Sequence, residues 1–216
     1  MDLRSTLGVL VGSLLLMLCS PTQASITAYT TEADFLTLIQ TIGVDQFDDL
    51  PAGVELSTPL SRLAGQFSYV ASAGPASDFL TASNGASDIW LSTNVGTDAM
   101  TFSNFSTGVQ AVGGFFFGTD IAGNATTVPA ITVTATDSDG TVIQTVLNPA
   151  LSSFLGFAST GAVISLTVTV GDQPGVWATA NDLTLGTVSS VPEPASFCLI
   201  AGGLAVFGVF ARRNMH

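Results

Sequence analysis

The chain of 216 residues has one histidine, two cysteines and no lysine, and each scarcity excludes a kind of chemistry. The histidine is His216, so the rest of the chain holds no Ser-His-Asp or Cys-His relay and no histidine-rich zinc site. Without lysine no Schiff base can form. Cys19 and Cys198 lie near opposite ends, and the stretch between them has no disulfide, thiol nucleophile or thiolate metal site. That stretch must therefore be stabilised by its hydrophobic core.

Basic residues are scarce, whereas acidic residues are not. Four Lys and Arg stand against 16 Asp and Glu, which gives a net charge of −12, and Arg62 is the only basic residue between Arg4 and Arg212. Nucleic acids and anionic membranes are bound by clustered Lys and Arg, so we expect neither as a partner of this acidic surface. Such a surface keeps a protein soluble and can also attract divalent cations. Solubility is the simpler of these two explanations.

The first 24 residues are typical of a secretory signal peptide. Arg4 supplies a positive start, residues 7–18 are apolar, and small residues precede an expected cleavage before Ser25. The alternatives are an uncleaved anchor and a lipoprotein. The apolar run is short for an anchor, and the large Leu18 before Cys19 stands where a lipoprotein signal needs a small residue.

The C-terminal residues combine two prolines, an apolar run and an arginine pair. Val191-Pro192-Glu193-Pro194 precedes an uncharged stretch over 195–211, which is followed by Arg212-Arg213. As a helix rising about 1.5 Å per residue, the stretch would be roughly 25 Å long, the lower limit for crossing a bilayer. The arginines would stay on the cytoplasmic side, and the prolines would keep the outer side extended and accessible. A plain anchor and a last hydrophobic strand are the alternatives.

This arrangement resembles the PEP-CTERM sorting signal of bacterial envelope proteins, in which a Pro-Glu-Pro triplet precedes a hydrophobic span and a terminal basic cluster. The resemblance implies that the chain is exported and held transiently in the inner membrane by its C-terminal helix. It also implies that an exosortase, a membrane protease, cuts near the triplet and that the product reaches the cell surface or the exopolysaccharide matrix. The residues of the expected signal are Val191, Pro192, Glu193, Pro194, Arg212 and Arg213.

The chain thus divides into several expected parts. They are a signal peptide over 1–24, a body over 25–187, a linker over 188–191, the sorting and anchor segment over 192–213 and a cytoplasmic tail over 214–216. The body has the length of a single domain.

The body is expected to be mainly β, with one short helix near its start. Thr31 can cap that helix together with Asp34, apolar residues follow at helical spacing as far as Ile42, and Gly43 ends it. Apolar runs and alternating patterns then predict short strands at 44–47, 67–71, 89–92, 99–103, 109–117, 131–136, 141–147, 154–157, 163–170 and 177–185, with a bulge at Gly113-Gly114 in the fifth.

These strands do not alternate with helices, so the pattern predicts an antiparallel two-sheet sandwich of jelly-roll type. The order of four short motifs, at 29–35, 47–53, 154–157 and 181–186, is similar to the sandwich body of many PEP-CTERM proteins of unassigned biochemistry.

Paired carboxylates are the remaining route to catalysis. A glycosidase needs two of them on one bond, but Asp48 and Asp49 are adjacent and would point to opposite faces of a strand. Asp137 and Asp139 flank a tight turn, where we expect solvated carboxylates of ordinary acidity. A glycoside hydrolase is therefore the weakest hypothesis, and we expect no enzymatic activity.

A structural calcium ion is a further hypothesis for the acidic residues. Asp137-Ser138-Asp139-Gly140 begins like a calcium loop, but the twelfth position is Asn148 rather than Glu, so a hairpin turn explains it better. By analogy with jelly-roll carbohydrate-binding modules, Asp48 or Asp49 could meet Asp182 and hold calcium. No other cofactor is expected.

Exposed aromatic rings could bind sugar. Trp90 and Trp177 are the candidates to stack on pyranose rings, although most aromatic side chains of a small sandwich belong to its core. The sequence therefore predicts a non-enzymatic, exported envelope or exopolysaccharide-associated protein. The alternative is a carbohydrate-binding module for extracellular polysaccharide.

Overall fold

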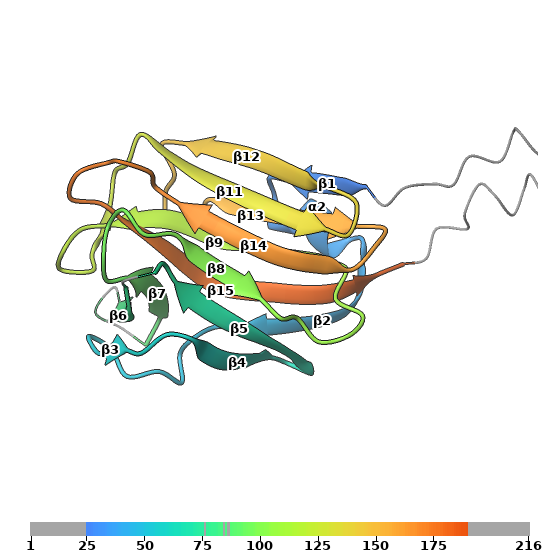
Figure 1. The fold of residues 1–216 in the computed structure, drawn as a ribbon, viewed down its shortest axis with the longest axis horizontal. Helices are drawn as coiled ribbons and strands as arrows, with labels where there is room; N and C mark the ends of the chain where they lie inside the picture. Colours follow the sequence, from blue (N-terminus) through green and yellow to red (C-terminus); the bar gives the residue numbers. More distant parts are fainter. Residues whose placement is uncertain (1–24, 76, 84, 86, 190–216) are drawn as a thin grey trace, which may run out of the picture. The chain divides into compact units, whose positions relative to one another are not determined.

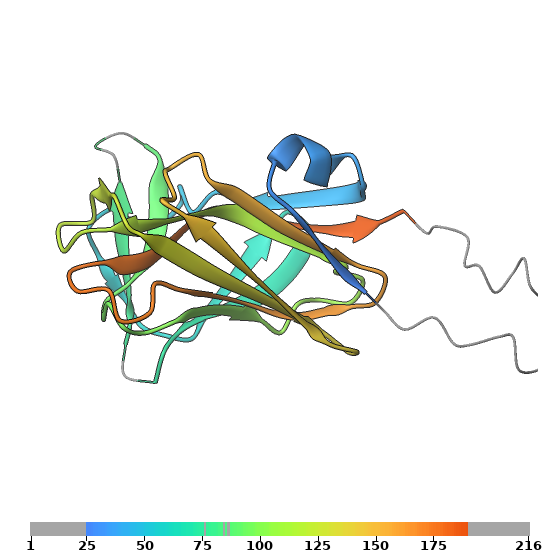
Figure 2. The same ribbon diagram turned by 90° about the horizontal axis from the view of Figure 1, so that it is seen from above.

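Strands dominate the structure. The computed structural model describes residues 25–75, 77–83, 85 and 87–189, and within them the chain forms two antiparallel sheets and one short helix (Figure 1). The sheets pack face to face in two layers, which Figure 2 shows from above. The predicted antiparallel sandwich is confirmed, while its jelly-roll connectivity stays a prediction.

The larger sheet has the order β1-β13-β9-β15-β7-β6-β3, with β10 added on β9 and β2 added on β15. Its strands are β1 (Ile26–Tyr29), β2 (Ile39–Asp45), β3 (Glu55–Leu56), β6 (Phe79–Ser83), β7 (Ile89–Thr93), β9 (Ala111–Thr119), β10 (Ala125–Thr126), β13 (Phe154–Ser159) and β15 (Trp177–Val188). The smaller sheet has the order β12-β11-β14-β8-β5-β4. Its strands are β4 (Leu60–Ala64), β5 (Phe67–Ala73), β8 (Met100–Ser103), β11 (Ala130–Asp137), β12 (Thr141–Leu147) and β14 (Val163–Thr169).

The core lies between the sheets, and strand alternation explains it. On β11 the side chains of Ile131, Val133 and Ala135 are fully buried, whereas the threonines between them face outward. Phe116 from β9 and Phe102 from β8 meet in the same apolar cluster. Each such large side chain contributes roughly 1.5–3 kcal/mol of transfer free energy. This burial stabilises a body that contains no cysteine.

The helix α2 (Glu32–Leu36) is shorter than predicted. Its start is as expected, because the Thr31 hydroxyl accepts a hydrogen bond from the Asp34 N–H at 3.3 Å. The predicted continuation through Ile39 and Ile42 is wrong, since these residues belong to β2, which pairs with β15. Long-range pairing of β-branched residues overrides the helical spacing.

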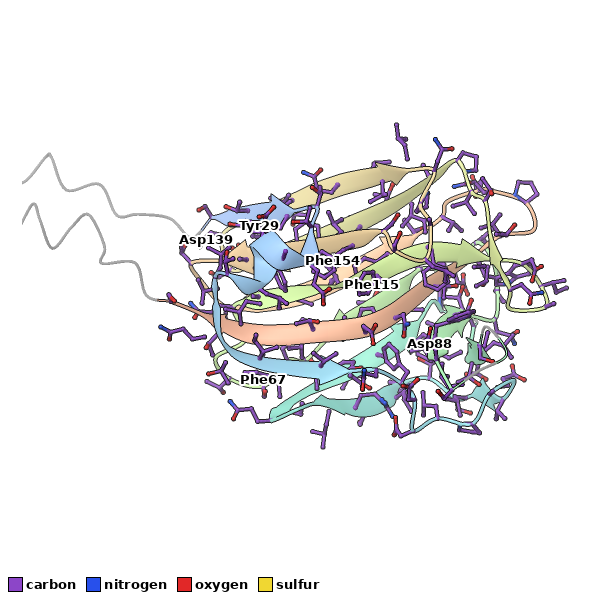
Figure 3. All side chains as sticks on the ribbon, turned by 180° about the vertical axis from the view of Figure 1, so that it is seen from behind. Tyr29, Phe67, Asp88, Phe115, Asp139 and Phe154 are labelled. Carbon is purple, nitrogen blue, oxygen red and sulfur yellow. The ribbon has the colours of Figure 1, made fainter. Side chains whose placement is uncertain are left out.

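Behind the larger sheet, α2 covers a second apolar cluster. The ring of Phe35 lies 5.4 Å from that of Phe154, and the ring of Phe115 lies 5.5 Å from that of Phe154. Figure 3 labels Phe115 and Phe154. Gly156 makes this contact possible, because a Cβ at that position would lie 2.5 Å from Phe35 Cδ2. Near α2, the outer face of the larger sheet therefore carries a second set of buried apolar side chains.

A β-bulge interrupts the pairing of β15 with β9. The register shifts between Asn181 and Thr184, which pair with Phe115 and Gly113. Thus the extra residue belongs to β15, and β9 runs unbroken through the glycine pair where the sequence predicted the bulge. Asp182, inside the bulge, has a left-handed backbone with φ of 49°.

Several predictions concern residues outside this part of the chain. The signal peptide over 1–24 and the apolar span are not among the described residues. Within the described ranges, no helix is long and apolar enough to cross a membrane. Strand β15 continues to Val188, the first residue of the predicted linker.

Candidate functional site

The sorting signal over 191–213 lies outside the described residues. Its assignment depends on sequence alone, and the geometry below concerns the body. Three places there combine polar chemistry with burial: the surroundings of Arg62, the bulge of β15 and a pocket beside Trp177.

Arg62 on β4 joins two carboxylates. Its Nη2 lies 2.5 Å from Asp45 Oδ1 and 2.6 Å from Asp49 Oδ1, its Nε donates to Asp45 at 2.9 Å and its Nη1 donates to Asp49 at 2.8 Å. The Tyr69 hydroxyl donates to the same Asp45 carboxylate at 2.6 Å. The guanidinium lies over the Phe47 ring, 5.6 Å from its centroid. We call Arg62, Asp45, Asp49 and Tyr69 the arginine cluster.

Interactions within the cluster favour the charged forms of Arg62 and Asp49 and the neutral form of Tyr69. Hydrogen bonds from Arg62 lower the pKa of Asp49. Burial lowers the pKa of Arg62, but hydrogen bonds to Asp49 and Asp45 outweigh it and the pKa is raised. Burial, followed by the charge of Asp45, raises the pKa of Tyr69. Both carboxylate oxygens of Asp49 accept hydrogen bonds from Arg62.

The other two predicted calcium ligands, Asp48 and Asp182, interact electrostatically. Asp48 Oδ1 accepts a hydrogen bond from the Ile89 N–H at 2.9 Å. Burial, then the charges of Asp88, Asp48 and Glu32, raise the pKa of Asp182 to about 6. No group of three or more His, Cys, Asp or Glu side chains within the described ranges is placed to hold a metal ion. The calcium site of Asp48, Asp49 and Asp182 stays a prediction.

The structure adds two residues that the sequence analysis did not select. Asn181 Nδ2 donates to Asp88 Oδ1 at 2.8 Å, which brings the start of β7 to the bulge. The Asn181 side-chain oxygen is buried and has no hydrogen-bond partner. These two residues lie 93 positions apart, so no local pattern predicts their contact.

Trp90 belongs to the core, not to a sugar site. Its side chain is 1% exposed, its ring stands edge-on to Phe117 at 5.4 Å, and its Nε1 donates to the Gly123 carbonyl at 3.1 Å. The ring is therefore closed to a sugar.

Trp177 is half-buried and borders a pocket of about 120 Å³. Leu80, Ile121 and Asp120 also line it. So do Ser92 and Thr119, whose hydroxyls lie 3.0 Å apart. The Trp177 Nε1 donates to the Asn94 carbonyl at 3.1 Å, which fixes the ring. A held aromatic ring beside hydroxyl and carboxylate groups can contact a small polar ligand.

Of the two turn aspartates expected to be solvated, Asp139 is exposed as predicted, but Asp137 is not. Asp137 is buried, and its Oδ1 accepts the Asp139 and Gly140 N–H groups at 2.8 and 2.9 Å. Its Oδ2 accepts the Ser159 hydroxyl at 2.7 Å. Burial raises the pKa of Asp137, but these hydrogen bonds outweigh it and the pKa is lowered. Asp137 stabilises the hairpin turn and is not a candidate acid at neutral pH.

Comparison with known proteins gives one finding. Residues 190–214 match the model of the PEP-CTERM protein-sorting motif. No curated protein and no solved structure matches the chain. The motif implies that the chain is an exported protein sorted by an exosortase, in agreement with the sequence analysis.

Proposed function

Because the chain carries a PEP-CTERM sorting motif over 190–214, we propose that it is a non-enzymatic surface protein of the envelope or exopolysaccharide matrix. In this proposal the chain is exported, anchored transiently in the inner membrane and cut near Pro192-Glu193-Pro194. Its β-sandwich body is then delivered as a structural or interaction module. The motif match is the observation that carries the proposal.

The chemistry of the body is consistent with this role. It has no histidine and no lysine, and its only basic residue, Arg62, is engaged by two carboxylates. Asp137, the buried turn carboxylate, is held ionised by its hydrogen bonds. Apart from Asp182, whose pKa is raised to about 6, these groups suit binding or coating better than acid-base chemistry.

Mass spectrometry of the mature protein tests the proposal. Cells with the exosortase should yield a product that lacks the apolar span, and cells without the protease should retain it. Replacing Pro192, Glu193 and Pro194 by alanine should block the cut, whereas Pro174→Ala in an exposed loop of the body should not. Equal retention of the tail in both strains would refute exosortase processing.

A second candidate function, carbohydrate binding, is favoured by the pocket beside Trp177. Its test is a glycan array of acidic and neutral polysaccharides. Binding should be lost in Trp177→Leu and largely kept in Trp177→Phe, because an aromatic face remains for stacking. If the parent protein binds no polymer on the array, or if Trp177→Leu binds as well as the parent, sugar binding at this pocket is refuted.

A further inference from the structure

Strand β12 lies at an edge of the smaller sheet (Figure 1), and among the described residues its one partner strand is β11. Next to the hairpin turn, the Asp137 N–H donates to the Gly140 carbonyl at 3.0 Å. At the far end of the same ladder, the Asn148 N–H donates to the Pro129 carbonyl at 3.0 Å. Hydrogen-bonded and non-bonded pairs alternate between these two ends. The backbone groups that point away from β11 therefore belong to every second residue, namely Thr141, Ile143, Thr145 and Leu147.

This edge has none of the features that usually prevent another strand from adding to a sheet. Residues 141–147 read Thr-Val-Ile-Gln-Thr-Val-Leu, with no charge, proline or glycine. The opposite edge of the same sheet, β4, carries Arg62 and follows Pro59. On β12 the side chains of Ile143 and Leu147 are 62% and 71% exposed. A long, uncharged and partly apolar edge accepts another strand readily, and proteins usually protect such edges with charge, proline or a bulge.

The charge of the chain favours a second copy of it as the added strand. A net charge of −12 makes two copies repel each other wherever their acidic surfaces meet. Strand β12 brings none of that charge to a contact, so two copies can approach through this edge. A basic partner, by contrast, would find no carboxylate on β12 to recognise it.

The free backbone groups define the register of such a pair. The antiparallel register that pairs all of them is centred on Gln144, with a two-fold axis through the contact. Ile143 of one copy then lies opposite Thr145 of the other, and Thr141 lies opposite Leu147. In this register Ile143 is also diagonal to Ile143 and Leu147 of the second copy, which is within reach of long side chains. The exposed apolar side chains of the edge therefore cover one another.

We propose that two copies of the body join through β12 as an antiparallel pair, so that their smaller sheets form one continuous sheet. The pair gives the outward N–H and C=O groups of β12 protein partners in place of water, as in other cases of strand addition. It also removes part of Ile143 and Leu147 from water. This self-association is a property of the body and depends neither on exosortase processing nor on sugar binding beside Trp177.

Cysteine cross-linking of the full chain in neutral detergent tests this register, with Cys19 and Cys198 replaced by serine. Gln144→Cys places two thiols at the two-fold axis, where facing Cα atoms of a non-bonded pair lie about 4.5 Å apart, within the disulfide range of about 4.4–6.8 Å. Mild oxidation should therefore link this variant into a dimer. Thr141→Cys on the same strand is the matched control and should link several times less, because its two copies would lie roughly 20 Å apart along the strands.

Thr145→Pro distinguishes strand addition from other contacts between copies. Proline at this position removes no hydrogen bond to β11, but it removes an outward donor and obstructs a partner strand. Added to Gln144→Cys, it should lower the amount of linked dimer to that of Thr141→Cys and leave the urea midpoint nearly unchanged.

Three results would overturn the proposal. Gln144→Cys could link no more than Thr141→Cys, or Thr145→Pro could leave the linking unchanged. The third is slow hydrogen exchange of the Ile143 and Thr145 amides in a dilute monomer, since a segment of the same chain would then cover the edge.

Discussion

The strongest prediction for the stability of the body concerns Arg62→Met. Methionine keeps much of the apolar stem over Phe47 but removes every N–H that serves Asp45 and Asp49. Asp45 is 4% exposed and Asp49 is 70% exposed, so the two losses differ in size. Removing one partner of a buried ion pair costs about 3–5 kcal/mol, whereas an exposed pair contributes at most about 1 kcal/mol. The free energy of unfolding should therefore fall by about 3–5 kcal/mol at neutral pH.

Urea and thermal unfolding of the full chain in neutral detergent measure this change. For a body of this size the expected loss corresponds to a fall in Tm of about 6–20 °C. Asp49→Asn is the matched control and should lose less than about 1 kcal/mol, because its carboxylate is exposed. Adding Asp45→Asn to Arg62→Met should restore a large part of the loss, since no uncompensated buried charge remains and an acceptor for Tyr69 is kept.

A small effect would refute the reasoning. If Arg62→Met loses less than about 1 kcal/mol, the arginine cluster behaves as a surface ion pair. If Asp45→Asn fails to restore stability in the Arg62→Met background, the loss comes from packing rather than from the unpaired carboxylate.

Three further predictions concern stability. The pKa of Asp182 is raised to about 6, so protonated Asp182 stabilises the folded state at low pH, and this stabilisation is lost as pH rises from about 4 through about 6. In metal-free buffer, Asp182→Asn should remove this decline in the free energy of unfolding from a pH series of unfolding curves. Ser159→Ala removes a hydrogen bond to the buried Asp137 carboxylate and should lower the free energy of unfolding by about 1.5–3 kcal/mol in urea titrations. Gly156→Ala places a Cβ 2.5 Å from Phe35 Cδ2 and should lower the same quantity by about 1–3 kcal/mol, with Gly140→Ala, where the Cβ meets nothing within 4 Å, as the control.

Sequence patterns correctly predicted the features that depend on residues close together in the chain. The alternation of threonine with Ile131, Val133 and Ala135 identified β11, and the Asp137–Gly140 turn identified its hairpin with β12. The Thr31 cap was predicted for the same reason, since it depends on residues three apart. Strand pairing was not predictable in this way, because β2 pairs with β15, a strand far from it in the sequence. This pairing also ends the helix early.

The candidate sites were likewise hard to predict, because they join residues that are far apart in the sequence. Asp48 and Asp182 were selected from charge and an analogy, but nothing near Asp182 in the sequence indicates Asp88 or the orphaned oxygen of Asn181. The arginine cluster could have been predicted from the sequence, because Arg62 is the only basic side chain of the acidic body that could pair with a buried carboxylate. Burial of Trp90 depends on Gly123 and Phe117, which are distant in sequence.

Strand β15, the last strand before the sorting motif, determines whether the body stays folded after exosortase cleavage. Strand β15 is hydrogen-bonded to β9 over most of its length and to β2 as far as Val188, and the N–H of Ser189 still donates to the Leu38 carbonyl at 3.2 Å. A cut after Ser189 breaks the chain without removing any of these hydrogen bonds, so the released body keeps its two sheets. A scission before Leu183 would instead leave β2 without its only partner strand among the described residues.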